Sequence, residues 1–323
     1  MSSSYSLSPK VLDIDLEAEA DRICARIRAT LSGELRRRGL VVAVSGGIDS
    51  STCLGLAVRA LGPERVFALI MPERDSADDS AARAKELIAH LGVRYTEQNI
   101  APTLEAIGCY RWRDEAVRRA LPEFGPGWKF KIVIAGGIEG RVNAFHIVAH
   151  SPEGREIDQR LGLQEYLQIV AATNFKQRIG KTLESFHADR LNYAVTGTPN
   201  RLEYDQGFFV KNGDGSADIK PIAHLYKTQV YAMARHLGLP DRVVAAIPTT
   251  DTYSLPQGQD EFYFALPYRE MDLALWALND GRPASELAAA LNITEQRAAA
   301  IYADIETKRR TTSYLHHPPV LMT

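Results

Sequence analysis

The segment VVAVSGGIDSS, residues 41–51, combines residue types that suit phosphate binding. An apolar, β-branched run ends in the pair Gly46–Gly47, and glycines at a turn from a buried strand into a helix let a ligand approach the main chain. The first turn of the helix then offers unpaired N–H groups and the positive end of the helix dipole, which together bind anions and most commonly phosphate. Three hydroxyl groups can add donors, those of Ser45, Ser50 and Ser51.

An acid, Asp49, lies inside this predicted phosphate loop. A carboxylate repels phosphate, so its presence indicates that it holds Mg²⁺ between itself and the phosphates, since Mg²⁺ binds hard oxygen ligands. The loop is not of the Walker A type, because it lacks the Gly-Lys-Ser/Thr ending of that motif. A glycine-rich turn that binds no ligand remains the alternative when the motif is taken alone.

The sequence around this loop alternates between apolar runs typical of buried strands and amphipathic stretches typical of helices. This β-α-β-α-β order predicts an α/β fold with a doubly wound, open parallel sheet and helices on both faces. Right-handed crossovers bring the carboxyl ends of such strands to one edge, where these sheets bind ligands. We expect strands at residues 40–44, 65–71, 93–100 and 191–198, and helices at about 13–38, 49–61, 77–91, 102–120 and 162–190.

Residues 128–159 depart from this pattern, because two β-rich runs flank the sequence GGIEG and predict a hairpin. No internal repeat or linker divides the chain. We therefore expect one domain, residues 1–323, with 128–159 as a β-rich insertion within it. Four further helices are expected towards the C-terminus, at about 225–238, 267–280, 284–291 and 294–310.

Composition and charge exclude several classes of protein. The chain has 323 residues and a formal net charge of −2, so it lacks the overall positive field that attracts nucleic acid or anionic membranes. No apolar run is long enough to span a bilayer, and the Ser-rich N-terminus lacks the apolar segment of a signal peptide. The three cysteines are widely separated, which argues against a zinc knuckle or a dithiol site and suits a reducing compartment. We expect a cytoplasmic protein without nucleic-acid or membrane partners.

The motif SGGIDS resembles the pyrophosphate loop of the ATP pyrophosphatases, which split ATP into AMP and pyrophosphate and adenylate an acceptor. Further motifs resemble, in order and spacing, those of the ammonia-dependent NAD synthetases within that group. The resemblance extends from about residue 40 to residue 310, and its longest motif is highly specific. The motifs are NFKQR (174–178), GTPNRLE (197–203), GFFVKNGDGSADIKPIAHLYKTQV (207–230), PTTD (248–251), DEFYFALPYREMD (260–272) and TKRR (307–310).

The resemblance implies roles for individual residues of this chain. Asp49 and Glu203 match the two acids that bind Mg²⁺, and Lys227 joins them as an implied catalytic group that contacts phosphate. Contacts with ATP are implied for Ser45, Gly46, Gly47, Asp49, Ser50, Ser51, Thr198, Lys227 and Thr249. Binding of nicotinic acid adenine dinucleotide is implied for Arg178, Lys211, Asp218 and Lys308. Structural alternatives are open for two of these residues, since Asp218 can brace a turn and Lys308 can stabilise a helix C-terminus.

The implied reaction has two steps. The nicotinate carboxylate of the dinucleotide acid attacks the α-phosphorus of ATP, and ammonia then attacks the acyl adenylate, which gives NAD, AMP and pyrophosphate. Catalysis would consist mainly of positioning and charge neutralisation. The synthetase motifs leave no room for an amidase module with an activated nucleophile, so ammonia is the expected donor, either free or supplied by a separate glutaminase. The resemblance also implies a homodimer with the dinucleotide acid bound at the subunit interface.

Three departures from the family pattern leave the acceptor open. Gly180 stands where the pattern has a second arginine, Thr307 stands where it usually has histidine, and the segment 128–159 is extra. A paralogue that amidates another carboxylate is therefore the alternative within the enzyme class. A non-catalytic regulator that binds adenine nucleotides is the alternative outside it, although a sensor need not keep both Asp49 and Glu203.

Overall fold

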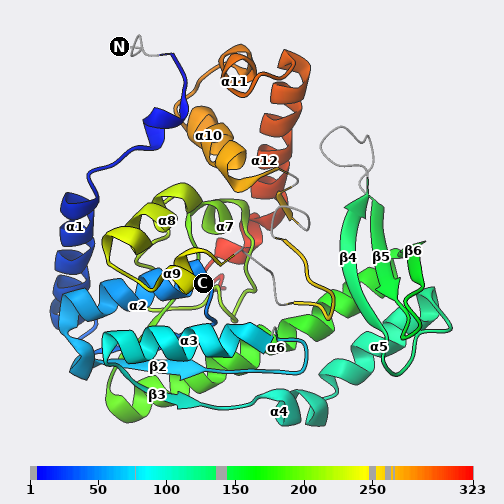
Figure 1. The fold of residues 1–323 in the computed structure, drawn as a ribbon, viewed down its shortest axis with the longest axis horizontal. Coiled ribbons are helices and arrows are strands. Elements are labelled where there is room, and N and C mark those ends of the chain that lie inside the picture. Colours follow the sequence, from blue (N-terminus) through cyan, green and yellow to red (C-terminus); the bar gives the residue numbers. More distant parts are fainter. Residues whose placement is uncertain are drawn as a thin grey trace.

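A parallel sheet of four strands forms the centre of the computed structural model (Figure 1). The strands lie in the order β3-β2-β1-β7, and Leu40 in β1 is paired with Val66 of β2 on one side and with Ala194 of β7 on the other. The strands are β1 (Leu40–Ala43), β2 (Val66–Ile70), β3 (Arg94–Glu97) and β7 (Ala194–Thr196). The structure describes residues 6–76, 78–135, 144–246, 252–258, 263–264 and 266–322.

Helices cover both faces of this sheet, because alternate side chains of each strand point to opposite sides. Val42 points to the face that is covered by four helices, whereas its neighbour Val41 packs on the other face against α6 (Leu163–Leu191). The four helices are α1 (Leu16–Ala29), α2 (Ile48–Leu61), α3 (Asp78–Leu91) and α8 (Lys227–His236). The predicted doubly wound α/β fold is confirmed.

Two of the expected helices are interrupted. The helix expected over 13–38 is regular only in α1 and continues as a wider turn, Thr30–Glu34, in which the N–H of Leu35 donates to the carbonyl of Thr30. The helix expected over 102–120 is divided into α4 (Ala101–Ala106) and α5 (Cys109–Ala120). The division falls at Gly108, whose φ of +81° lies in the left-handed region that glycine tolerates best.

Three antiparallel strands follow α5 and form a second, smaller sheet in the order β4-β5-β6. The expected hairpin is present as β4 (Lys129–Ala135) and β5 (Ala144–His150), with its GGIEG turn outside the described residues. The third strand, β6 (Glu156–Arg160), was not predicted. The buried face of this sheet packs against α5 and α6, and the ring of Phe145 stacks on Tyr166 of α6 at 3.6 Å between ring centres. Figure 1 shows this sheet beside α5, away from the N-terminal helix α1.

The C-terminal helices form a third layer with a core of their own. In Figure 1 they lie together beyond α7 and α8. The last helix ends at His316 rather than near residue 310, and none of the described helices combines the length and the hydropathy needed to cross a membrane. The remaining helical elements are a short 3-10 turn (Pro9–Leu12), a second one (Pro63–Arg65), α7 (Arg201–Gln206), α9 (Asp241–Val244), α10 (Tyr268–Asn279), α11 (Ala284–Leu291) and α12 (Glu295–His316).

The turn between β1 and α2 depends on one glycine. Gly46 has a φ of +80°, and a Cβ atom at this position would lie 2.3 Å from the carbonyl oxygen of Ser80. The Gly46 carbonyl in turn accepts a hydrogen bond from Nε of Arg83 at 3.2 Å. The turn is therefore held against the start of α3 at a separation that only glycine permits.

Replacing Gly46 with alanine tests this close approach, and Gly238 provides the matched control. Gly238 has a φ of +67°, but a Cβ atom there would meet nothing within 4 Å. Gly238→Ala should lower the free energy of unfolding by about 1 kcal/mol through backbone strain alone. Gly46→Ala should cost at least about 1–2 kcal/mol more, because the backbone of Ser80 must also move. Urea denaturation of both variants measures the difference, and equal losses would contradict the proposed close packing.

Candidate active site

A cavity of about 740 Å³ opens at the carboxyl ends of β1, β2 and β7. This is the edge at which the sequence predicted a ligand site. Its walls are formed by the segments that follow these strands, by one face of α6, and by residues of α7, α8 and the segment 252–253. The volume suits a nucleotide-sized ligand, since small-molecule sites commonly enclose about 300–1,000 Å³.

The turn after β1 and the start of α2 contribute to the cavity four of the residues predicted to contact ATP, namely Ser45, Gly47, Asp49 and Ser50. The hydroxyl groups of the two serines lie close together, with 3.2 Å between the Oγ atoms of Ser45 and Ser50. Gly47 caps α2 without a side-chain hydrogen bond, so the helix presents its N-terminal N–H groups towards the cavity end of the turn. Gly46 does not line the cavity, and Ser51 is fully buried with its hydroxyl donating to the Gly47 carbonyl at 2.8 Å.

A cluster of three charges lies next to this turn. The Lys227 ammonium donates to Oδ2 of Asp49 and lies 3.9 Å from Oε1 of Glu203. Asn200 joins the two acids, because its side-chain amide donates to Oδ1 of Asp49 at 3.1 Å while its backbone N–H donates to Oε2 of Glu203 at 3.1 Å. The structure therefore brings together two acids that are far apart in the sequence, around one buried ammonium.

Local sequence explains how Glu203 reaches this position. Asn200 caps the N-terminus of α7, and its Oδ1 accepts hydrogen bonds from the N–H groups of Leu202 and Glu203. The Glu203 carboxylate in turn accepts the backbone N–H of Asn200, which completes a capping box. This reciprocal pair fixes the carboxylate at the first turn of α7, where the helix dipole also favours a negative charge.

Lys227 is also held by a third acid, Asp272 of α10. Asp272 is fully buried and accepts the backbone N–H groups of Lys227 at 3.1 Å and of Thr228 at 2.7 Å, so it caps the start of α8. Burial raises the pKa of Asp272 to about 6, although these N–H groups favour its charged form. Burial alone would lower the pKa of Lys227, but the carboxylates of Asp49 and Glu203 outweigh it and raise that pKa, so the ammonium stays charged.

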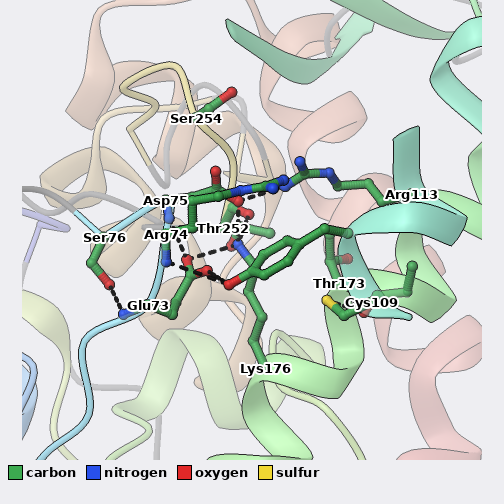
Figure 2. A network of polar contacts seen from close by, with 12 residues as sticks. Glu73, Arg74, Asp75, Ser76, Cys109, Arg113, Thr173, Lys176, Thr252 and Ser254 are labelled. Carbon is green, nitrogen blue, oxygen red and sulfur yellow. Dashed lines mark hydrogen bonds and ion pairs between the residues drawn. The ribbon is translucent and has the colours of Figure 1, made fainter. Parts of the chain in front are cut away.

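A second charged cluster is centred on Lys176, and Figure 2 shows its contacts; Lys176 and its partners Glu73 and Thr252 line the cavity. Lys176 of α6 donates to Oε1 of Glu73 at 2.9 Å, to Oδ2 of Asp75 at 2.8 Å and to the carbonyl of Thr252 at 2.9 Å. Arg113 of α5 donates to the same Asp75 oxygen at 2.5 Å. Burial opposes the charge on Asp75, but Lys176 and Arg113 more than compensate and lower its pKa.

This Lys176 cluster connects the segment after β2 with α5, α6 and the segment 252–258. The latter segment is also attached to β4, because the N–H of Phe130 donates to Oγ of Ser254 at 2.9 Å and Gln257 donates its side-chain amide to the carbonyl of Ile132 at 2.7 Å. The antiparallel sheet is thereby linked to the rim of the cavity through hydrogen bonds.

The residues predicted to bind the dinucleotide acid lie elsewhere. Thr198, predicted to contact ATP, lines the cavity, whereas Arg178, Lys211, Asp218 and Lys308 do not line it. Nε of Arg178 donates to the carbonyl of Lys211 at 3.3 Å. The Lys211 ammonium donates to the carbonyls of Tyr314 and His317, and so caps the C-terminal end of α12.

The remaining predicted residues of this set have structural partners. Asp218 accepts the backbone N–H of Val195 at 2.7 Å, which agrees with its alternative role as a brace. Lys308 bonds to Asp304 at 2.6 Å within α12 and lies 5.0 Å from the ring centre of Tyr263, a residue of the cavity wall. Thr249, predicted to contact ATP, lies outside the described residues.

Sequence reasoning missed Asn200, Asp272 and Lys176. Asn200 carried a detectable signal, since Asn-x-x-Glu at 200–203 has the spacing of a capping box. Lys176 and Asp272 lie inside quoted motifs, but their partners are distant in sequence and no local pattern identifies them.

Comparison with known proteins adds to this geometry. A family model described as NAD synthase matches residues 19–120 and 145–312. A protein of Rhizobium meliloti (strain 1021) named NH(3)-dependent NAD(+) synthetase is 54% identical over 316 residues, which are 98% of this chain and 94% of that protein. A protein of the same name from Mesorhizobium japonicum is 51% identical over 96% of this chain and 98% of its own length.

Solved structures show the same fold at lower identity. A structure of NMN synthetase from Francisella tularensis aligns with a TM-score of 0.67 and 20% identity, over 96% of this chain and 99% of its own. A structure of NH3-dependent NAD synthetase from Campylobacter jejuni, in complex with nitrate, aligns with a TM-score of 0.63 and 20% identity, over 96% and 100%.

Proposed function

Because the chain belongs to the NAD synthase family, we propose that it is an ATP-dependent ligase that converts nicotinic acid adenine dinucleotide and ammonia into NAD. In the proposed reaction, ATP adenylates the nicotinate carboxylate and ammonia displaces AMP. The relatives with 54% and 51% identity over nearly the whole chain are named for this activity. The products are NAD, AMP and pyrophosphate.

The single structural observation that carries the proposal is the charge cluster of Asp49, Glu203 and Lys227 beside the N-terminus of α2. It combines two carboxylates, a buried ammonium and a helix N-terminus at one end of a nucleotide-sized cavity. This is the set of groups that a triphosphate with a divalent cation requires. A regulator that only senses nucleotides has no need of both acids, so the cluster favours the enzyme.

Mg²⁺ fits the residues at this end of the cavity. Mg²⁺ binds hard oxygen ligands and is commonly held by one or two carboxylates together with substrate phosphates. Asp49 and Glu203 supply two such carboxylates, and both lie within ion-pair distance of the same ammonium. When bound by these acids, the ion would neutralise charge on the phosphate oxygens.

For the adenylation step we assign the following roles. The hydroxyls of Ser45 and Ser50, which line the cavity, and the first N–H groups of α2 bind phosphate oxygens and fix the triphosphate against the β1–α2 turn. Lys227 neutralises the charge that develops as the nicotinate oxygen forms its bond to the α-phosphorus and the bond to pyrophosphate breaks. Asp272 holds the backbone N–H of Lys227 at the start of α8 and Asp49 pairs with its ammonium, so this ammonium is preorganised before substrate arrives.

For the amination step the nucleophile is neutral ammonia, which attacks the acyl carbon. The C–N bond forms, the bond from the acyl carbon to the AMP oxygen breaks, and one proton leaves the nitrogen. This step needs no covalent enzyme intermediate. We propose that the chain uses free ammonia, as the names of its relatives indicate for those proteins.

The dinucleotide acid is assigned to Arg178, Lys211, Asp218 and Lys308 by resemblance to the family motifs. These residues lie outside the cavity, and we propose that a homodimer completes the acid's site at the subunit interface. A location in the cytoplasm is part of the same proposal, since all three cysteines are free and buried.

A second candidate function is amidation of another carboxylic acid. Two observations favour this alternative. Gly180 and Thr307 both depart from the family pattern in motifs that are implied to bind the acid substrate. The ATP chemistry would be the same in this case.

The two acids can be tested with variants that preserve shape. Asp49→Asn and Glu203→Gln should each lower turnover by about two orders of magnitude or more, which corresponds to roughly 3 kcal/mol of transition-state stabilisation. Asp21→Asn is the matched control, since Asp21 is an exposed acid that pairs with Arg59 on the surface. Steady-state rates at saturating Mg²⁺ with circular dichroism measure the effect. Near-normal turnover in either variant would remove that residue from the site.

The function itself is tested by product analysis. Purified protein with MgATP, nicotinic acid adenine dinucleotide and ammonium chloride should form NAD, AMP and pyrophosphate in equal amounts. Glutamine in place of ammonia should give little NAD, because the chain has no assigned amidase nucleophile. A panel of other carboxylic acids serves as the comparison. Pyrophosphate release with another acid, and no NAD, would contradict the substrate assignment.

A further inference from the structure

One face of α6 forms a polar wall of the cavity. A helix face buried against a protein core is normally apolar, so a buried polar stripe faces something other than the core. The stripe follows helical spacing of three and four residues. Its members are Thr173, Lys176, Gln177, Gly180, Lys181 and Glu184, all of which line the cavity.

The two lysines of this stripe differ in how completely they are paired. The Lys176 ammonium has three protein acceptors, which match its three N–H donors (Figure 2). The Lys181 ammonium has one acceptor among the described residues, Oε2 of Glu184 at 2.8 Å. Both side chains of the second pair are buried, at 10% exposure for Lys181 and 6% for Glu184. Lys181 therefore retains N–H donors that no residue in the described part of the chain accepts.

The acids around Lys181 are buried, and burial disfavours their charged forms. Burial raises the pKa of Glu184, which Lys181 opposes, and burial also raises the pKa of the neighbouring Asp214. Lys220 lies close enough for Lys181 to add to the lowering of its pKa by burial. Removing two charges from water costs free energy that their mutual attraction often fails to recover, so a buried ion pair contributes little to the stability of the fold. The pair is thus better explained by a ligand than by packing.

The residue before Lys181, Gly180, bears on the role of the Lys181–Glu184 pair. It stands where the family pattern has an arginine, and a Cβ atom there would only reach ordinary contact with Met71 at 3.4 Å. The chain thus lacks a cation at position 180 but has one at the next position, with its side chain in the cavity wall.

We infer that Lys181 is a further substrate-binding residue, whose ammonium binds an anionic oxygen of a substrate, either a phosphate of ATP or an acidic group of the dinucleotide acid. Glu184 is a positioning residue that holds Lys181 at the wall. The inference rests on the proposed function for the identity of these two ligands. A charge-assisted hydrogen bond inside a cavity changes affinity by about ten- to a hundredfold, which sets the size of the expected effect.

The test uses the double variant Lys181→Met with Glu184→Gln, which removes both charges at nearly constant volume and leaves no buried charge unpaired. Lys181→Arg is the conservative variant. The surface control is Lys85→Met, which removes a lysine that pairs with Glu97 at 2.7 Å in an exposed position. Calorimetry measures the Kd of MgATP and of nicotinic acid adenine dinucleotide separately, and thermal denaturation measures Tm.

The double variant should raise one Kd by about ten- to a hundredfold and leave the other within about threefold, while the control changes neither. A selective loss of ATP affinity identifies a phosphate as the ligand group, and a selective loss for the acid identifies the dinucleotide. Lys181→Arg should recover part of the lost affinity. Unchanged Kd values for both ligands, or equal losses for both, would overturn the inference.

The proposed function is tested independently by NAD formation in the unaltered protein. If that protein binds MgATP but forms no NAD, the proposed function fails, and the role of Lys181 in phosphate binding is still decided by calorimetry. If it forms NAD and the double variant binds both ligands normally, the inference about Lys181 alone fails.

Discussion

The ammonium of Lys227, buried between Asp49 and Glu203, is the interaction on which the rest of the site depends. It joins the start of α2, the start of α7 and the start of α8, three elements that the sequence separates widely. A buried charge of this kind requires its partners, since removing one member of a buried pair costs about 3–5 kcal/mol. Asn200 donates to Asp49, and Asp272 accepts the backbone N–H of Lys227, so both members of the Asp49–Lys227 pair are held in place before any substrate is present. We consider this preorganisation the main contribution of the fold to catalysis.

The cavity wall contains two kinds of charged group. One kind holds the wall together, and the other has hydrogen-bonding capacity that a ligand could use. The Lys176 cluster is closed, because its acids and bases satisfy one another and thereby fix the segment after β2 to α5 and α6. The Lys181–Glu184 pair is open towards the cavity on the same helix. A closed cluster shapes the cavity, whereas an open pair has hydrogen-bonding capacity left for a ligand. The antiparallel sheet contributes to the closed cluster through its hydrogen bonds to residues 254–257.

The sequence predicted what local patterns determine. Buried apolar strands and a glycine turn identified the parallel sheet and the edge at which the cavity opens. Sequence patterns did not predict β6, because the segment EIDQR is mostly exposed and lacks the apolar alternation of a half-buried strand. They also missed α7, a helix of six residues that is defined by its capping box rather than by an apolar face. The contact of Asn200 with Asp49 spans 151 positions, and no local signal reports such a pairing. The acceptor-binding residues remain predictions for the same reason, since their proposed site involves a second subunit.

The central claim is that the nicotinate carboxylate attacks the α-phosphorus of ATP at this cluster, so that an oxygen of the acid is transferred to AMP. The most direct measurement uses nicotinic acid adenine dinucleotide labelled with ¹⁸O in the carboxylate, followed by mass spectrometry of the products. The account predicts one ¹⁸O atom in the phosphate of each AMP, one in the amide carbonyl of NAD, and none in pyrophosphate. Unlabelled AMP, or label in pyrophosphate or inorganic phosphate, would contradict it.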